Sequence, residues 1–128
     1  MRILIDTHAF LWWVDGTRVL PAKARAALAE SDNECFFSVA SAWELAIKAG
    51  LGKLKLSRPV KRFVVENVAA NGFRMLDIGI SHVGRVETLA AHHDDPFDRL
   101  LIAQALEEKI LIVSADSIFG KYGVKRIW

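Results

Sequence analysis

Short apolar runs alternate with longer stretches of helical character along the whole sequence. The most pronounced run, ILIVSAD at 110–116, is rich in β-branched residues, which favour strands, and it ends in an acid. Strands that alternate with helices form parallel sheets, because each parallel connection needs a crossover element. The sequence therefore predicts an α/β fold with a central parallel sheet covered by helices on both faces.

The same pattern gives the order of the elements. Strands are predicted at 2–6, 35–39, 73–78, 110–116 and 124–128. Helices are predicted at 20–31, 41–50, 58–72, 81–93 and 96–109, with shorter helical stretches after residue 6 and after residue 116. The segment LGKLKLS, which begins at residue 51, fits either a loop or an extended stretch.

Size and composition limit the class of protein. A chain of 128 residues, 52% hydrophobic and 25% charged, is expected to form one folded domain over residues 1–128. Its single cysteine, Cys35, excludes an internal disulfide and suits a reducing cytoplasm. No apolar run approaches the roughly 18 residues that span a bilayer, and MRILIDTHAF does not read as a signal peptide. We therefore expect a cytoplasmic protein without a membrane association.

Four acids occupy comparable places in this pattern. Asp6 and Asp116 end the first and fourth predicted strands, whereas Glu44 and Asp98 lie just inside predicted helices. Ligands of open parallel sheets gather beyond the carboxyl ends of the strands. The four carboxylates are therefore expected near one edge of the sheet.

Each acid taken singly also has a purely structural interpretation. Asp6 and Asp116 can cap the helical turns that follow them. Ser41 and Glu44 have the spacing of a capping box, and Asp95, followed by a proline, can cap the helix over 96–109. Capping and ligand binding both remain open for each acid alone.

The acids are harder to explain if they converge. Two unit charges about 4 Å apart repel by roughly 4 kcal/mol at an effective dielectric constant of about 20. A hard divalent cation relieves this repulsion, and Mg²⁺ and Mn²⁺ prefer carboxylate and water oxygens. Convergence therefore predicts a site for Mg²⁺ or Mn²⁺.

A second charge pattern lies between residues 45 and 62, where six basic residues occur without an acidic one. Such a strip suits a polyanion, but it is also typical of a solvated helix face. The residues that can bind RNA phosphates are Lys48, Lys53, Lys55 and Arg58.

Four segments resemble, in order, the PIN-domain family, and within it the VapC-type ribonuclease toxins. They are ILIDTHAFLWW, SVASAWELAIKAGLGKL, DDPFDRLLIAQAL and ILIVSADSIFGKYGVKRIW, which together extend over essentially the whole chain. The shared motifs are a strand-final acid followed by Thr, the W-E pair, D-x-x-L-I-A and S-x-D. One such motif is weak, whereas the ordered set is specific.

The resemblance implies a three-layer α/β/α sandwich and a Mg²⁺- or Mn²⁺-dependent endoribonuclease that hydrolyses RNA with metal-activated water. Such a protein is the toxin of a type II, VapBC-type toxin–antitoxin system. The catalytic acids carried over are Asp6, Glu44, Asp98 and Asp116. Asp6 and Asp98 would hold the principal metal directly, and Asp116 and Glu44 would bind through water or a second ion.

The resemblance also implies roles around these acids. Ser114 matches a small hydroxyl position, Thr7 would steady the first turn, and Asp95 is expected only to cap. No histidine is expected in catalysis; the four are assigned to caps or the surface, namely His8, His82, His92 and His93.

Two partners besides RNA follow from the resemblance: a cognate VapB-type antitoxin that covers the acids, and a second copy of the chain in a homodimer. The aromatic residues that can contact a partner, or belong to the core, are Phe10, Trp12, Trp13 and Trp43. The alternative function is a PIN scaffold that binds protein or RNA without cleaving it.

Overall fold

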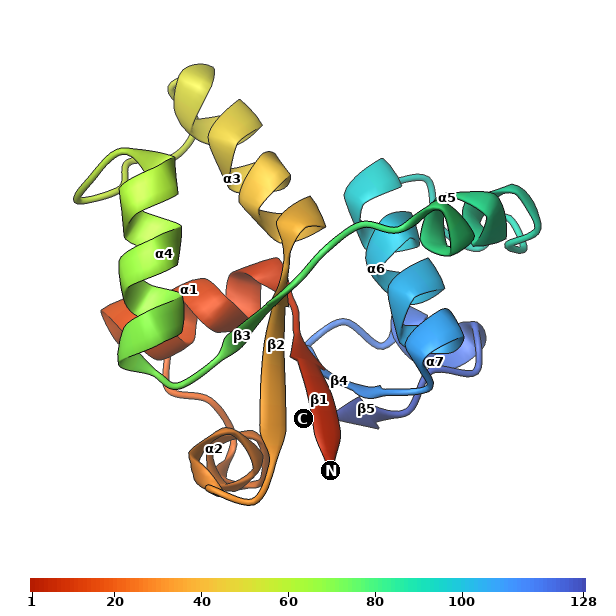
Figure 1. Ribbon diagram of the computed structural model, residues 1–128, viewed down its shortest axis with the longest axis horizontal. Coiled ribbons are helices and arrows are strands. Elements are labelled where there is room, and N and C mark those ends of the chain that lie inside the picture. The colour runs from red at the N-terminus through yellow and green to blue at the C-terminus, as the bar shows by residue number, and fades with distance from the viewer.

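A computed structural model describes residues 1–128 and shows a five-stranded sheet with the order β3-β2-β1-β4-β5 (Figure 1). All four strand pairs are parallel. The strands are β1 (Arg2–Ile5), β2 (Glu34–Ser38), β3 (Arg74–Leu76), β4 (Leu111–Val113) and β5 (Arg126–Ile127). The predicted parallel sheet is therefore confirmed, with each strand near its predicted place.

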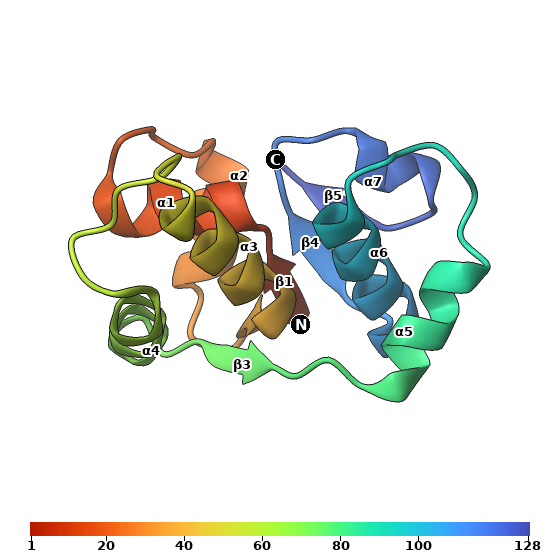
Figure 2. The same ribbon diagram turned by 90° about the horizontal axis from the view of Figure 1, so that it is seen from above.

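Helices cover both faces of the sheet, so the predicted three-layer arrangement is also confirmed (Figure 2). The helices are α1 (Thr7–Asp15), α2 (Ala22–Ala29), α3 (Val39–Gly50), α4 (Val60–Ala70), α5 (Ile80–Glu87), α6 (Pro96–Glu108) and α7 (Ile118–Lys121). None of them combines the length and the apolar character that a membrane crossing requires.

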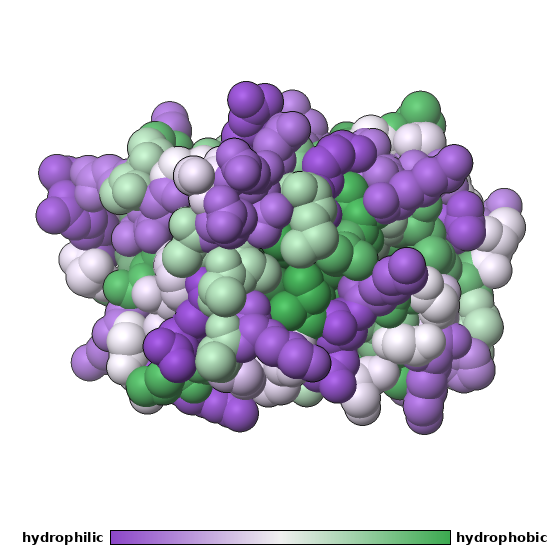
Figure 3. Space-filling view, turned by 90° about the horizontal axis from the view of Figure 1, so that it is seen from below, coloured by the Kyte–Doolittle hydropathy of each residue, from purple (hydrophilic) through white to green (hydrophobic).

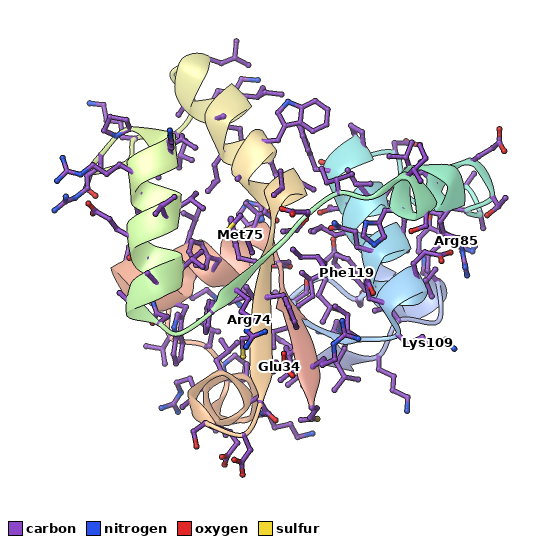
Figure 4. All side chains as sticks on the ribbon, viewed as in Figure 1. Glu34, Arg74, Met75, Arg85, Lys109 and Phe119 are labelled. Atoms are coloured by element: carbon purple, nitrogen blue, oxygen red, sulfur yellow. The ribbon has the colours of Figure 1, made fainter.

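Alternate side chains of the strands enter two separate cores. Ile3 and Ile5 of β1 pack with residues of α1 to α4, whereas Leu4 packs on the other face with residues of α6 and α7. Phe119 of α7 is buried in this second core (Figure 4). A strand buried on both faces needs a continuous apolar run, which is why RILI carries no alternation of polar and apolar residues.

Two element boundaries differ from the prediction in ways that matter for the site. Helix α3 begins at Val39, because the Ser38 hydroxyl accepts the Ala40 N–H and caps the helix. The predicted Ser41–Glu44 capping box is therefore wrong, and Glu44 lies in the second turn.

The predicted helix over 81–93 is shorter, because α5 ends at Glu87 and residues 88–95 form a loop. Instead of continuing a helix, the loop offers the carbonyl groups of Ala90 and His93 to the Arg99 guanidinium, which also donates to Val86 O at the end of α5.

Register brings the carboxyl ends of the three central strands level. Ile5 pairs with Phe37 of β2 and with Val113 of β4. The next residues along each strand, Asp6, Ser38 and Ser114, therefore all lie at this edge of the sheet, and two helices begin there.

A buried polar residue of α6 ties this edge together. The Gln104 side chain is fully buried; its Oε1 accepts the Ser38 hydroxyl and its Nε2 donates to the Asp77 carbonyl. It therefore links α6 to the end of β2 and to the segment after β3. Unpaired buried polar groups are costly, so this residue is expected to matter more than a surface ion pair on the same helix.

We expect Gln104→Ala to lower the free energy of unfolding by about 2–4 kcal/mol, because it leaves a cavity and an unpaired Ser38 hydroxyl. Urea denaturation measures the change. The control is Glu107→Ala, which removes only the partly exposed contact to Arg85 at 2.8 Å and is expected to cost less than about 1 kcal/mol (Figure 4 labels Arg85). Equal losses in the two variants would contradict this account of Gln104.

Candidate functional site

The four predicted acids meet at the carboxyl edge of the sheet. Asp6 follows β1, Asp98 lies in the first turn of α6, Asp116 lies between β4 and α7, and Glu44 comes from α3. Their charges act on one another: Asp98 raises the pKa of Asp6, and Glu44 raises the pKa of Asp98. Asp98 and Asp116 form a tight cluster with His93, whereas Asp6 and Glu44 lie at the same edge outside that cluster and act on it through their charges.

Asp6 is the most enclosed of the three aspartates. Only 7% of it is exposed, and its Oδ1 accepts the Ala9 N–H at 2.8 Å, so it caps α1. Burial raises its pKa from 3.8 to about 6, against the opposing effects of the Ser114 hydroxyl, the Ala9 N–H and the charge of His8. Capping and ligand binding do not exclude each other, because a carboxylate has two oxygens.

Glu44 is buried but balanced by a cation. Its Oε2 lies 2.6 Å from Lys48 Nζ one turn later on α3, and its Oε1 accepts the Thr7 hydroxyl at 2.7 Å. Thr7 Oγ1 also lies 2.8 Å from Ser41 Oγ. Thr7 therefore does more than steady its own turn: it connects the start of α1 to α3 and fixes the orientation of Glu44.

Asp98 has a partner that sequence reasoning missed. Its Oδ2 lies 2.7 Å from His93 Nε2, and ligand atoms of His93, Asp98 and Asp116 lie within 4.8 Å of one another. The expectation that His93 is a cap or a plain surface residue is therefore wrong. The sequence feature that could have indicated this contact is the position of His93, five residues before Asp98 in the segment that leads into the helix.

Both members of the pair have raised pKa values, for different reasons. Burial raises the pKa of Asp98, with help from the charges of Asp95 and Glu44, while the hydrogen bond from His93 opposes the rise. The pKa of His93 is raised first by its hydrogen bond to Asp98 and then by the charges of Asp98, Asp116 and Asp95. A protonated imidazole is therefore favoured among these carboxylates.

The loop of residues 88–95, which carries His93, is fixed by hydrogen bonds from two residues outside it. Arg99 Nη1 donates to the carbonyls of Ala90 at 3.0 Å and His93 at 3.2 Å. The Tyr122 hydroxyl donates to Ala90 O at 2.7 Å and accepts the His92 N–H at 2.9 Å. These contacts fix a loop that has no regular structure of its own.

Asp116 is the exposed member of the group. Its N–H donates to Ser114 Oγ at 3.0 Å, and its Oδ1 accepts the Ile118 N–H at 3.0 Å, so it supports the turn before α7. The N-cap of α7 is Ser117 rather than Asp116, so the predicted cap is wrong in its position. Ser114 is fully buried. Asp95 accepts the N–H groups of Phe97 and Asp98, which confirms it as the cap of α6.

The remaining histidines lie apart from the three-residue cluster. His82 is buried, and its Nδ1 accepts the Gly79 N–H at 2.9 Å, which confirms a capping role but not a surface position. His8 and His92 are exposed, as expected.

The predicted RNA-binding residues do not behave as one group. Lys48 pairs with Glu44, and Arg58 Nη1 lies 3.0 Å from a Glu66 carboxylate oxygen on α4. Lys53 and Lys55 are exposed and form no ion pair. Only two of the four basic side chains are therefore unengaged.

The aromatic residues considered for an interface also differ in exposure. Phe10 is fully buried beside Phe37, so of the two alternatives it belongs to the core. Trp12 and Trp13 pack half-buried against the first core. Trp43 is 52% exposed and lies against Phe97, the residue before Asp98, with ring centroids 4.9 Å apart.

The opposite edge of the sheet differs in chemistry. A hollow of about 340 Å³ there is lined by apolar residues of α6, β4 and the segment before β5, with Lys109 and Lys125. Figure 3 shows apolar side chains among polar ones on this face. None of the four acids lines this hollow, so the acids mark the carboxyl edge alone.

The family model of the PIN domain matches residues 3–125. The chain belongs to the PIN domain family. No curated protein matches the sequence significantly.

Solved structures agree on the fold of this PIN domain. VapBC2 from Rickettsia felis, bound to a promoter DNA fragment, gives a TM-score of 0.72 at 14% identity over 100% of both chains. FitAcB from Neisseria gonorrhoeae gives 0.61 at 17% identity over 97% of this chain and 95% of that one. A PilT N-terminus domain protein from Sulfolobus solfataricus gives 0.58 at 14% identity over 99% and 86%. At these identities the likeness concerns the fold.

The donor set at the acidic edge fits a hard divalent cation. Asp98 and Asp116 offer carboxylate oxygens within 4.8 Å of each other, and Asp6 lies at the same edge outside that cluster; Mg²⁺ and Mn²⁺ prefer such oxygens. His93 Nε2 belongs to the cluster but can bind a cation only when the imidazole is deprotonated. The raised pKa values of Asp6 and Asp98 mean that their ionised forms are disfavoured without a compensating cation.

Asp6→Asn is expected to stabilise the metal-free protein. Because the pKa of Asp6 rises from 3.8 to about 6 on folding, the folded state binds the proton more tightly, and stability falls as pH rises through this window. The ionised form costs about 3 kcal/mol above pH 6, and asparagine retains the cap. We expect a gain of about 1–3 kcal/mol at pH 7.5 and little change at pH 4, measured by urea denaturation with a chelator.

Asp94→Asn, at an exposed neighbouring acid, is the control and should change stability little at either pH. Excess Mn²⁺ should reverse the order of wild type and Asp6→Asn at pH 7.5. A gain from Asp6→Asn that does not depend on pH would contradict the assignment to desolvation.

Proposed function

We propose that this PIN domain is a metal-dependent endoribonuclease, the toxin of a VapBC-type toxin–antitoxin system that acts in the cytoplasm. The observation that carries the proposal is the meeting of Asp6, Glu44, Asp98 and Asp116 at one edge of the sheet, where burial raises the pKa of two of them. The likeness to VapBC2 and FitAcB supports the toxin class.

The residues of the chain would divide the work at a phosphodiester. Asp6, Asp98 and Asp116 would hold Mg²⁺ or Mn²⁺, which supplies activated water and neutralises charge on the phosphate oxygens when bound. Asp6 is fixed by its cap to Ala9, and Asp98 by His93.

Glu44 would act from the side of the site. Thr7 and Lys48 hold its two oxygens, so it would orient a water rather than move toward a metal. The product would carry a 5′-phosphate and a 3′-hydroxyl.

Loss of one central acid tests the nuclease assignment. We expect Asp98→Asn to reduce metal-dependent cleavage of a structured RNA at least about 100-fold, because a carboxylate that binds the cation becomes a weaker amide ligand. Asp94→Asn, four residues away and exposed, should cleave at the wild-type rate. Cleavage is measured over a titration of Mg²⁺ and of Mn²⁺.

Two results would count against the nuclease. Undiminished cleavage by Asp98→Asn would mean that the activity comes from a contaminant or from another site. RNA binding without cleavage by the wild type at any metal concentration would favour the alternative function, a non-catalytic binding module.

We also propose that a VapB-type antitoxin covers this site and that the chain forms a homodimer. The α3 surface beside the acids supports the first point: Trp43, Ile47 and Leu51 are exposed along it by 52%, 39% and 65%. An exposed apolar surface of this kind commonly contacts a partner. Trp43 reaches the site through its contact with Phe97.

Antitoxin binding should therefore protect Trp43 from solvent. We expect acrylamide quenching of tryptophan fluorescence to decrease when the antitoxin encoded beside this chain is added, and Trp43→Phe to remove most of that decrease. Trp128, which is half-buried and stacks near Trp12, provides the matched control as Trp128→Phe. If the protection persists in Trp43→Phe, the antitoxin lies elsewhere.

A further inference from the structure

A second recess adjoins the acids on the side of α1 and α3. It is a hollow of about 270 Å³, close to the lower end of the roughly 300–1,000 Å³ typical of ligand pockets. We call it the α1–α3 hollow, and its lining consists of Thr7, His8, Leu11, Leu45, Lys48, Lys53 and Leu54.

The α1–α3 hollow shares walls with the acidic site. Thr7 and Lys48 line the hollow and both contact the Glu44 carboxylate, at 2.7 Å and 2.6 Å. His8 also lines it and lies close enough to Asp6 for its charge to lower the pKa of that acid. A chain molecule bound at the acids can therefore extend directly into the hollow.

The lining of the hollow combines apolar side chains with cations. The half-buried Leu11 and Leu54 provide the apolar surface, the buried Leu45 lies behind them, and no carboxylate takes part in the lining. Lys53 is exposed and has no acidic partner among the ion pairs of the structure. This combination suits a ligand with a planar, weakly polar part and an anionic part, as a nucleotide has.

The other basic residues between 45 and 62 do not combine an unpaired charge with an apolar recess. Arg58 and Arg62 both contact Glu66, so their charges are compensated on α4. Lys61 is exposed on α4 but does not line the hollow. The uncompensated charge at the hollow therefore comes from Lys53.

We propose that the α1–α3 hollow is the subsite for the nucleotide next to the scissile phosphate. Its base lies against Leu11 and Leu54, with Leu45 behind them, and its phosphate contacts Lys53. A base stacked in a duplex cannot enter such a recess, so the proposal selects RNA that is unpaired at this position. This proposal rests on the proposed nuclease function. It adds the feature of the substrate that the site recognises, an unpaired nucleotide.

The first test compares two lysines of one strip. Lys53→Gln is expected to raise the KM for cleavage of a single-stranded oligoribonucleotide about five- to tenfold with kcat nearly unchanged, and to reduce the salt slope of binding by about one. Lys61→Gln removes the same charge outside the hollow and should change KM less than about twofold. Equal effects of the two variants would overturn the proposal in favour of general electrostatic attraction.

The second test does not depend on catalysis. Adenosine and uridine 5′-monophosphates are added to the whole chain with methyl-labelled leucines, and NMR records the methyl signals. We expect those of Leu11, Leu45 and Leu54 to shift through the ring current of the base, whereas ribose 5-phosphate and inorganic phosphate leave them in place.

The two tests separate failure of the subsite from failure of the nuclease. Cleavage of RNA without leucine shifts would overturn the subsite and leave the nuclease intact. Leucine shifts in a chain that cleaves no RNA would support the subsite as a nucleotide site and remove the nuclease function on which its placement beside a scissile phosphate rests.

Discussion

Asp6 is enclosed at the end of the central strand, and this enclosure sets the electrostatics of the carboxyl edge of the sheet. Strands on both sides end level with β1, so a side chain that follows β1 has little access to water. Its carboxylate is therefore tolerated only with partners, which the backbone of α1 and the Ser114 hydroxyl supply in part. These hydrogen bonds do not fully compensate the negative charge of Asp6, so this edge of the sheet attracts positive charge.

Two basic side chains of the protein pair with the acids that lie near Asp6. Lys48 pairs with Glu44 and His93 with Asp98, so two of the acids have a basic partner. These contacts limit the repulsion that the carboxylates would otherwise exert on one another. They also fix the acids before any ligand arrives, which is the condition for a preorganised site.

Sequence patterns predicted the sheet and the meeting of the acids, because both follow from where strands end. They did not predict the contact of His93 with Asp98. That contact depends on a loop that is held by Arg99 and Tyr122, and Tyr122 lies 29 residues after His93 in the chain. The start of α3 was missed for a related reason: Ser38 caps this helix immediately after its strand, without an intervening loop.

The double role of Lys48 has a consequence for regulation by charge. One ammonium group faces both Glu44 and the α1–α3 hollow, so an anion in the hollow and the Glu44 carboxylate compete for it. Free-energy linkage is reciprocal: an anion that drew Lys48 away would leave the Glu44 charge without its partner, and a cation near Glu44 would free Lys48 for the anion. If both neighbouring sites bind ligands as proposed, their occupancy would be coupled through this single side chain.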